Sequence, residues 1–313
     1  MEQSVTAAQD DYRFKLKYQP PFDWDALIAF LAARATPGVE VVEASCYRRT
    51  IAVDGHTGTL QVEHCPTTPA IDLEVRFPDS HAMPVIVERV GRMFDLGADP
   101  AAIARHFAGD PLLGPLLTRH PGLRTPGAWD AFEVSVRAIL GQQVSVAAAT
   151  TIAGRIATRF GTAIESGDGL NRIFPTPGQL AAASIEEVGV IGSRAETIRA
   201  LARAVIAGTV TFTAPSASSE VTAALQAVRG IGPWTAQYIA MRALGEPDAF
   251  LSGDLILRRM AGGGSARVLE QQSERWRPWR AYAVMLLWQA ARDAESARPK
   301  VMDGVARLRP RSS

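Results

Sequence analysis

One acidic residue in an apolar setting is the first candidate for chemistry in this sequence. Asp254 follows the small residues Ser252 and Gly253, and an apolar run starts at Leu255. The simplest role is a helix N-cap, in which the carboxylate accepts hydrogen bonds from the next turn. A capped carboxylate at the edge of an apolar cleft stays ionised, and it can stabilise positive charge that builds up during a reaction. The oxocarbenium-like sugar formed when a glycosidic bond breaks is one such charge. We predict that Asp254 is both a cap and a catalytic residue.

Three aromatic residues form a second constellation. Trp234 and Tyr238 are four residues apart and share one face of a predicted helix, and Trp288 lies in a last predicted helix over about 279–294. Aromatic residues at helical spacing are more often part of the core than of a ligand wall. Their electron-rich faces would also bind a positively charged alkylated purine, for about 1–2 kcal/mol per good contact. Both roles remain open at this point.

A glycine hairpin precedes this aromatic helix. In Gly230-Ile231-Gly232-Pro233 the glycines are expected to turn with positive φ and to leave their N–H groups unpaired at a helix N-terminus, which makes a seat for a phosphate. Pro233 suits the first helical position, and Gly245 is placed to end the helix. An ordinary turn between two helices is the alternative.

An enzyme that takes a base out of a duplex must fill the gap that the base leaves in the stack, and a side chain inserted there acts as a wedge. Gln142 or Gln143, after a helix predicted over about 129–140, can fill it. Alternatively, both residues cap and hydrogen-bond a helix junction.

The elements that must position these residues fall into two parts. Up to about residue 112, a helix around 24–31 precedes strands at 39–47, 49–53, 59–62 and 71–77, with Asp54-Gly55 as a turn, and Pro84 and Pro100 open further helices. From about residue 113 to 295 the pattern is helical. Ser145 is a predicted N-cap, and Ser184 and Ser193 have capping-box spacing. The fold class is α+β: an N-terminal antiparallel-sheet α/β domain (1–112), an all-helical domain (113–295) and a basic tail (296–313) predicted to be disordered.

Composition limits the classes of function. The net charge of +1 argues against coating of nucleic acid by charge alone, although residues 255–313 hold twelve Lys and Arg against five Asp and Glu. Two cysteines, Cys46 and Cys65, are too few for a disulfide framework or an iron–sulfur site, and the histidines have no metal-ligand spacing. We therefore expect no metal. The sequence also has no Gly-x-x-x-x-Gly-Lys motif and no dinucleotide-binding fingerprint, so we expect no nucleotide cofactor. No membrane-spanning run and no signal-peptide core are present, so a cytoplasmic protein is expected.

The hairpin, together with several longer segments, resembles the DNA-3-methyladenine glycosylase II family, the bacterial alkylbase DNA glycosylases of the helix–hairpin–helix superfamily. The resemblance spans about residues 19–288, and its motifs are Gln19-Pro-Pro-Phe-Asp-Trp24, Phe30-Leu-Ala-Ala-Arg34, Asp130-Ala-Phe-Glu followed by Gly141-Gln-Gln-Val-Ser145, and Trp276-Arg-Pro-Trp-Arg.

This resemblance implies a base pocket in a cleft between two helical subdomains. It places the catalytic aspartate on Asp254, the pocket on Trp234, Tyr238, Trp288 and Phe30, and the wedge on Gln143. It places DNA binding on the backbone around Gly230, Ile231, Gly232 and Thr235, with a monovalent cation at the hairpin carbonyls.

The implied enzyme is a monomeric, monofunctional glycosylase that acts on double-stranded DNA with damaged bases, needs no cofactor and leaves an abasic site. Trp234 stands where bifunctional relatives carry a lysine for a Schiff base. Ser252-Gly253 stand where the family often has proline, and Leu255 where it can have tyrosine, so the range of bases is open. The alternatives are a glycosylase for oxidised, deaminated or mismatched bases, and a non-catalytic damage sensor that keeps the hairpin.

Overall fold

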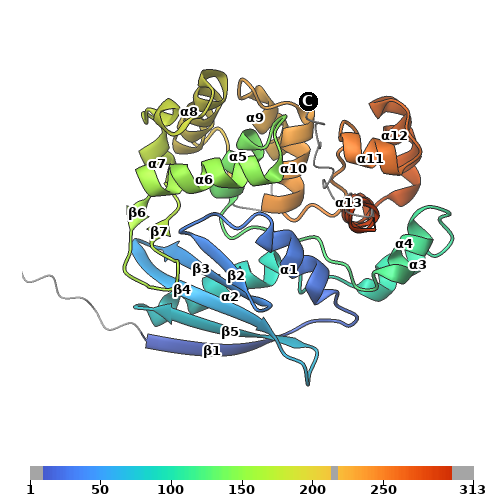
Figure 1. Cartoon of the computed structure of the whole chain (residues 1–313), viewed down its shortest axis with the longest axis horizontal. Helices are drawn as coiled ribbons and strands as arrows, with labels where there is room; N and C mark the ends of the chain where they lie inside the picture. Colours follow the sequence, from blue (N-terminus) through green and yellow to red (C-terminus); the bar gives the residue numbers. More distant parts are fainter. Residues whose placement is uncertain (1–9, 213–217, 298–313) are drawn as a thin grey trace, which may run out of the picture.

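A five-stranded antiparallel sheet forms the N-terminal part of the computed structural model, which describes residues 10–212 and 218–297 (Figure 1). The strand order is β1-β5-β4-β3-β2. The strands are β1 (Asp10–Lys17), β2 (Glu40–Glu43), β3 (Cys46–Val53), β4 (His56–His64) and β5 (Ala70–Phe77).

The predicted sheet is confirmed, with two differences. Asp54 and Gly55 both have positive φ, as a tight hairpin turn between β3 and β4 requires. The strand predicted over 39–47 is in fact two strands, because Ala44 and Ser45 also turn with positive φ without a glycine or asparagine to signal it. Strand β1 was not predicted, although it pairs with β5 along its whole length.

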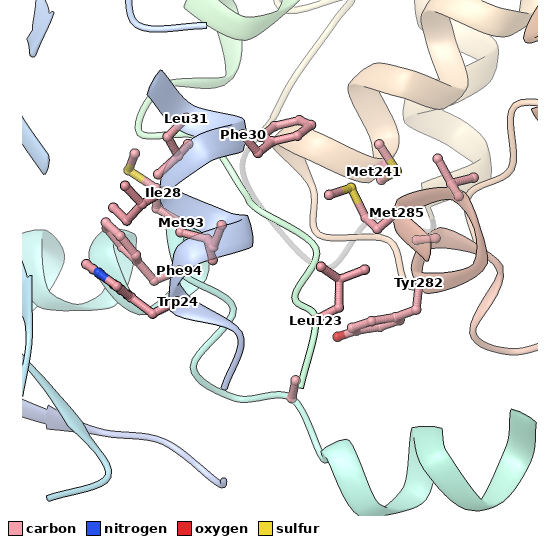
Figure 2. Close-up of a cluster of buried hydrophobic side chains, with 14 of the residues drawn as sticks. Trp24, Ile28, Phe30, Leu31, Met93, Phe94, Leu123, Met241, Tyr282 and Met285 are labelled. Atoms are coloured by element: carbon pink, nitrogen blue, oxygen red, sulfur yellow. The ribbon is translucent and has the colours of Figure 1, made fainter. Parts of the chain in front are cut away.

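Helices from the first half of the chain share the hydrophobic core of the sheet. Pro84 lies in the first turn of α2 and Pro100 in that of α3, as predicted. On the sheet side of α1, Trp24 stacks on Phe94 with 5.6 Å between ring centroids (Figure 2). These helices are α1 (Trp24–Ala32), α2 (Met83–Met93), α3 (Pro100–Phe107) and α4 (Leu113–Arg119).

The second half is helical, as predicted, apart from a small ladder of β6 (Thr162–Ala163) and β7 (Arg172–Ile173) that was not foreseen. Ser145 caps α6, but the two predicted capping boxes are wrong: Ser184 makes no side-chain cap, and Ser193 lies inside α8. The helices are α5 (Ala131–Leu140), α6 (Val146–Phe160), α7 (Pro177–Leu180), α8 (Gly192–Ile206), α9 (Ser218–Ala227), α10 (Pro233–Ala243), α11 (Leu255–Met260), α12 (Ala266–Ser273) and α13 (Arg280–Ser296).

Helix α10 contributes to two hydrophobic cores. Ala240 and Met241 belong to the core that joins the sheet, α1 and α13, whereas Ala236 and Ile239 belong to the core of α5, α6, α8 and α9. In Figure 1, α10 accordingly lies between α5–α9 on one side and α11–α13 on the other. The first core thus runs from the sheet into the C-terminal helices, and the chain crosses between subdomains at α10.

The proposed domain boundary at residue 112 falls between α3 and α4. Most of the proposed tail, residues 298–313, lies outside the described residues. Among the residues that are described, no helix has both the length and the apolar character needed to cross a bilayer.

Asp95 joins the N-terminal part to α13 and should make stability depend on pH. Burial raises its pKa to about 6, although the N–H of Thr125 and the hydroxyl of Tyr282 donate to its Oδ2 at 3.1 and 2.8 Å. A raised pKa means that the folded state holds the proton more tightly than the unfolded state. The free energy of unfolding therefore falls as pH rises from about 4 through 6.

Asp95→Asn should remove this dependence, because the amide oxygen can accept both hydrogen bonds and carries no charge. Relative to wild type, we expect the variant to gain on the order of 2 kcal/mol between pH 4 and pH 7, allowing for partial exposure to solvent. Urea denaturation at the two pH values measures the gain. Parallel pH profiles for the two proteins would contradict the prediction.

Candidate active site

The hairpin between α9 and α10 has one strained glycine and one unstrained glycine. Gly230 has φ +93°, as predicted, and a Cβ there would lie 2.0 Å from Oγ1 of Thr197 on α8. Gly232 has φ −89° and ψ 176°, which any residue can adopt, so the prediction of positive φ is wrong for this glycine. Because no atom lies within 4 Å of a Cβ built on Gly232, the fold itself does not require glycine at this position.

The free N–H groups of the hairpin are those predicted. Within the described residues, the N–H groups of Gly230 and Gly232 have no hydrogen-bond partner, and both glycines are exposed. Ile231 is buried and its N–H donates to the carbonyl of Val228, so this residue offers its carbonyl rather than its N–H. The side chain of Thr235 is also buried. The hairpin therefore presents two N–H groups at the N-terminus of α10, in a position suited to an anion.

Asp254 caps α11 and also faces the aromatic helix. Its Oδ1 accepts from the N–H groups of Ile256 and Leu257 at 2.9 and 3.0 Å. Its Oδ2 accepts from Nε1 of Trp234 on α10 at 3.2 Å. One carboxylate oxygen is thus fixed by the backbone, while the other points toward the aromatic face of α10.

Three of the four predicted pocket residues form one aromatic surface. Trp234 and Tyr238 stack with their ring centroids 5.4 Å apart and their planes 11° apart, and Trp288 of α13 lies 6.3 Å from Tyr238. All three side chains are partly exposed. Partial exposure separates these rings from buried core aromatics such as Trp276, and it leaves ring area for a ligand.

Phe30 lies behind this surface. It is buried, stacks toward Trp288 at 6.4 Å, and carries the guanidinium of Arg34 at 3.7 Å from its ring centroid. Figure 2 shows the ring projecting from α1 toward Met241, away from the sheet. Since Arg34 covers one face and protein surrounds the rest, Phe30 supports Trp288 rather than offering a free face.

Arg242 fixes the far end of the aromatic stack. Its guanidinium donates to the Tyr238 hydroxyl at 2.9 Å and to the carbonyls of Pro126 and Gly127. Burial raises the pKa of the Tyr238 phenol, but Arg242, with Arg34 and Arg137, outweighs it and brings this pKa below its usual value. The stack therefore has a negative end at Asp254 and a positive end at Arg242.

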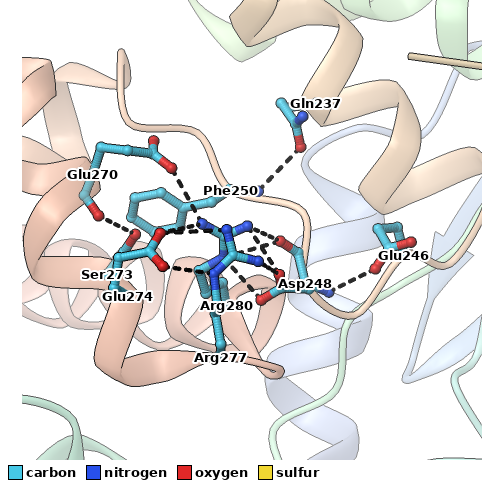
Figure 3. Close-up of polar contacts among 9 residues, drawn as sticks. All are labelled: Gln237, Glu246, Asp248, Phe250, Glu270, Ser273, Glu274, Arg277 and Arg280. Carbon is cyan, nitrogen blue, oxygen red and sulfur yellow. Dashed lines mark hydrogen bonds and ion pairs between the residues drawn. The ribbon is translucent and has the colours of Figure 1, made fainter. Parts of the chain in front are cut away.

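The segment between α10 and α11, which carries Asp254, is anchored by a network of charged residues (Figure 3). Arg280 of α13 binds both carboxylate oxygens of Asp248 at 2.8 and 2.9 Å, and Arg277 binds the same carboxylate. The N–H of Phe250 donates to Oε1 of Gln237 on α10 at 3.3 Å. The segment that leads to Ser252 and Gly253 is thus held at both α10 and α13.

The two glutamines after α5 have different environments. The side chain of Gln142 donates from Nε2 to the carbonyl of Gly230 and to the hydroxyl of Thr235, both at 3.0 Å. Gln143 is exposed and has φ +56°. Gln142 therefore has the junction role considered above, and Gln143 is the residue that projects outward.

Sequence analysis missed the two arginines beside the aromatic residues. Arg34 stands four residues after Phe30, and Arg242 four residues after Tyr238. On a helix, a cation at this spacing faces the preceding aromatic ring, which is a signal for Arg242 on α10, whereas Arg34 lies in the turn just after the end of α1. Leu255, next to Asp254, is 73% exposed, which is unusual for a large apolar residue.

Known proteins define the class to which this arrangement belongs. The family described as "AlkA N-terminal domain" matches residues 13–130, and the "HhH-GPD superfamily base excision DNA repair protein" matches residues 136–265. The fold and the hairpin are thus those of a helix–hairpin–helix base excision repair protein.

The similar proteins narrow this class to one family. DNA-3-methyladenine glycosylase 2 of Escherichia coli K12 is 38% identical over 282 residues, which cover 88% of this chain and 96% of that protein. A probable bifunctional transcriptional activator/DNA repair enzyme AlkA of Mycobacterium tuberculosis is 37% identical over 295 residues. These cover 91% of this chain and 58% of that protein. The structure of a 3-methyladenine DNA glycosylase from Archaeoglobus fulgidus superposes with a TM-score of 0.75 at 24% identity, covering 90% of this chain and 98% of that one, and shows the shared fold. The chain belongs to the AlkA-type DNA-3-methyladenine glycosylase II family.

Proposed function

We propose that this alkylbase DNA glycosylase is monofunctional, and that it takes alkylated purines such as 3-methyladenine and 7-methylguanine out of double-stranded DNA and hydrolyses their N-glycosidic bond. The observation that carries the proposal is the 3.2 Å hydrogen bond between Trp234 and Asp254. It places a carboxylate at the edge of a partly exposed aromatic surface. A positively charged base would stack on the rings, and Asp254 would stabilise the oxocarbenium-like sugar or orient the attacking water.

The lysines of the chain support hydrolysis without strand cleavage. The sequence has three: Lys15, Lys17 and Lys300. The first two lie on β1, at the edge of the sheet, and Lys15 is paired with Asp72 at 2.7 Å. A Schiff base with the sugar needs an amine in the pocket, and Trp234 occupies the position just after the hairpin.

DNA would be held by the hairpin N–H groups of Gly230 and Gly232, with Gln143 as the wedge. The carbonyl of Ile231 accepts no hydrogen bond within the described residues, so it fits the oxygen ligand that a monovalent cation requires. DNA affinity in potassium against tetramethylammonium chloride, at equal ionic strength, tests for that cation. A monomeric state, the absence of any other cofactor and a cytoplasmic location, where bacterial DNA lies, complete the proposal.

The test is release of free bases from methylated duplex DNA, followed by electrophoresis of the product strand. Release of 3-methyladenine and 7-methylguanine, with breaks that appear after alkali treatment alone, is the expected result. Breaks without alkali would overturn the monofunctional assignment. Release of oxidised or deaminated bases instead would overturn the substrate class.

Trp234→Phe should separate stacking from the hydrogen bond to Asp254. Phenylalanine keeps an aromatic ring against Tyr238 but has no N–H for Oδ2. We expect single-turnover excision to fall about tenfold, as for the loss of one hydrogen bond to a charged group, with unchanged binding to abasic-site DNA. Equal losses in rate and in binding would show instead that the indole acts through packing.

A further inference from the structure

The turn that carries Gln143 is tied to the hairpin by the neighbouring residue, Gln142. Nε2 of Gln142 lies 3.0 Å from the carbonyl of Gly230, which can only accept, so the amide is oriented with its NH2 group toward the hairpin. The second hydrogen of the same group is directed to the hydroxyl of Thr235 in the first turn of α10. A single side chain therefore spans the turn after α5 and both ends of the hairpin turn.

Helix α8 holds the other side of the same junction. The guanidinium of Arg194 donates to the main-chain carbonyl of Gln142, and Thr197 packs against Gly230 so closely that a Cβ there would clash. The backbone of Gln142 and the strained glycine are thus supported by one helix. The outward side chain of Gln143 has no such contact within the described residues, so its direction is set by the backbone of the turn.

We propose that Gln142 is a positioning residue that couples extrusion of the base to capture of the phosphate. This inference rests on the proposed function. Gly232 on the hairpin and Gln143 on the turn after α5 would contact the same DNA, and the Gln142 amide lies between them. When the hairpin binds a DNA phosphate, the Gln142 bridge then fixes the position of Gln143 relative to the DNA backbone. Without the amide bridge, the hairpin would still bind DNA, but the wedge turn would move independently of it.

If the two steps are coupled, the loss of excision rate in a Gln142 variant should grow with the free energy needed to extrude the base. Extrusion costs least where the base is unpaired. Two duplexes, each with one 7-methylguanine, opposite cytosine or opposite an abasic-site analogue, therefore separate positioning of the wedge from chemistry in the pocket. For Gln142→Leu, we expect single-turnover excision from the paired duplex to fall about 10–30-fold, as for two lost hydrogen bonds. From the unpaired duplex it should fall by less than about threefold, since the wedge matters little there.

Two further variants control the experiment. Gln179→Leu makes the same change at an exposed glutamine whose amide also bonds its surroundings, on α7, and should leave both rates within about twofold. Thr235→Val removes one of the two acceptors without changing the shape of the side chain. It should slow excision from the paired duplex alone. In the Gln142→Leu background it should cause little further loss of rate, since the two changes break one shared contact. It also serves as the test variant if Gln142→Leu fails to fold.

If Gln142→Leu slowed excision equally on the two duplexes, or did not slow it on the paired duplex, the inference would be overturned. Additive effects of the Gln142 and Thr235 changes would overturn it as well. If the wild type releases no base from either duplex, the proposed function itself is wrong. That outcome is distinct, because it does not involve the variants.

Discussion

Asp254→Asn is expected to lower single-turnover excision by about a thousandfold or more while leaving DNA binding intact, since the charge stabilises a state that forms only during bond cleavage. The amide oxygen of asparagine can still accept from Ile256 and Leu257, so the cap of α11 survives. Release of 7-methylguanine and binding to an abasic-site analogue, measured on the same protein, check both parts.

Two variants isolate the charge of Asp254 from its contacts. Asparagine cannot accept from Trp234 if its oxygen caps the helix, and the cost of that loss is given by Trp234→Phe. Asp254→Ala removes the cap as well and should lower the free energy of unfolding by about 1 kcal/mol. If Asp254→Asn and Trp234→Phe slowed excision equally, the charge would have no role of its own, and the assignment of Asp254 as catalytic residue would fail.

The stability of the protein should respond differently to alanine at the two hairpin glycines. Gly230→Ala meets positive φ, which costs about 1–2 kcal/mol, and an overlap with Thr197 that costs about 1–3 kcal/mol more. We therefore expect a clear fall in Tm. Gly232→Ala meets no neighbour and an ordinary φ, so the free energy of unfolding should change by less than about 1 kcal/mol.

Gly232→Ala, which should hardly change stability, should lower the affinity for DNA. A methyl group beside a free N–H would keep a phosphate away, and loss of a hydrogen bond to a charged group lowers affinity by about 10–100-fold. Titration of undamaged duplex DNA, together with a thermal melt, measures both quantities. A Gly232→Ala protein that binds DNA as the wild type does would show that the hairpin is an ordinary turn and not a phosphate site.

The parts of the site that were predicted from sequence are encoded locally. The hairpin, the cap at Asp254 and the shared face of Trp234 and Tyr238 each depend on residues within a few positions of one another. Strand β1 carries a local signal of the same kind, since Tyr12, Phe14 and Leu16 alternate with polar residues.

The rest depends on contacts between distant segments. Arg242 acts through Pro126 and Gly127, more than a hundred residues away, and Gln142 through Gly230. Ser193 has the spacing of a capping box, yet α8 begins one residue earlier, with Ile191 at the cap position. A short local pattern could not tell whether such a serine starts the helix or lies inside it.

Helix α10, shared by the two cores, has a consequence for how damage to this protein would appear in a cell. The rings of α10, which we propose as the base-binding surface, lie on a helix that packs in both cores, so opening of either core should disrupt that surface. A destabilising substitution far from the pocket, in the sheet or in α8, would then act as a repair defect. At the modest stability typical of proteins, a loss of about 1–2 kcal/mol changes abundance several-fold. Sensitivity of cells to alkylating agents should thus reflect the stability of the whole chain as well as the identity of its pocket residues.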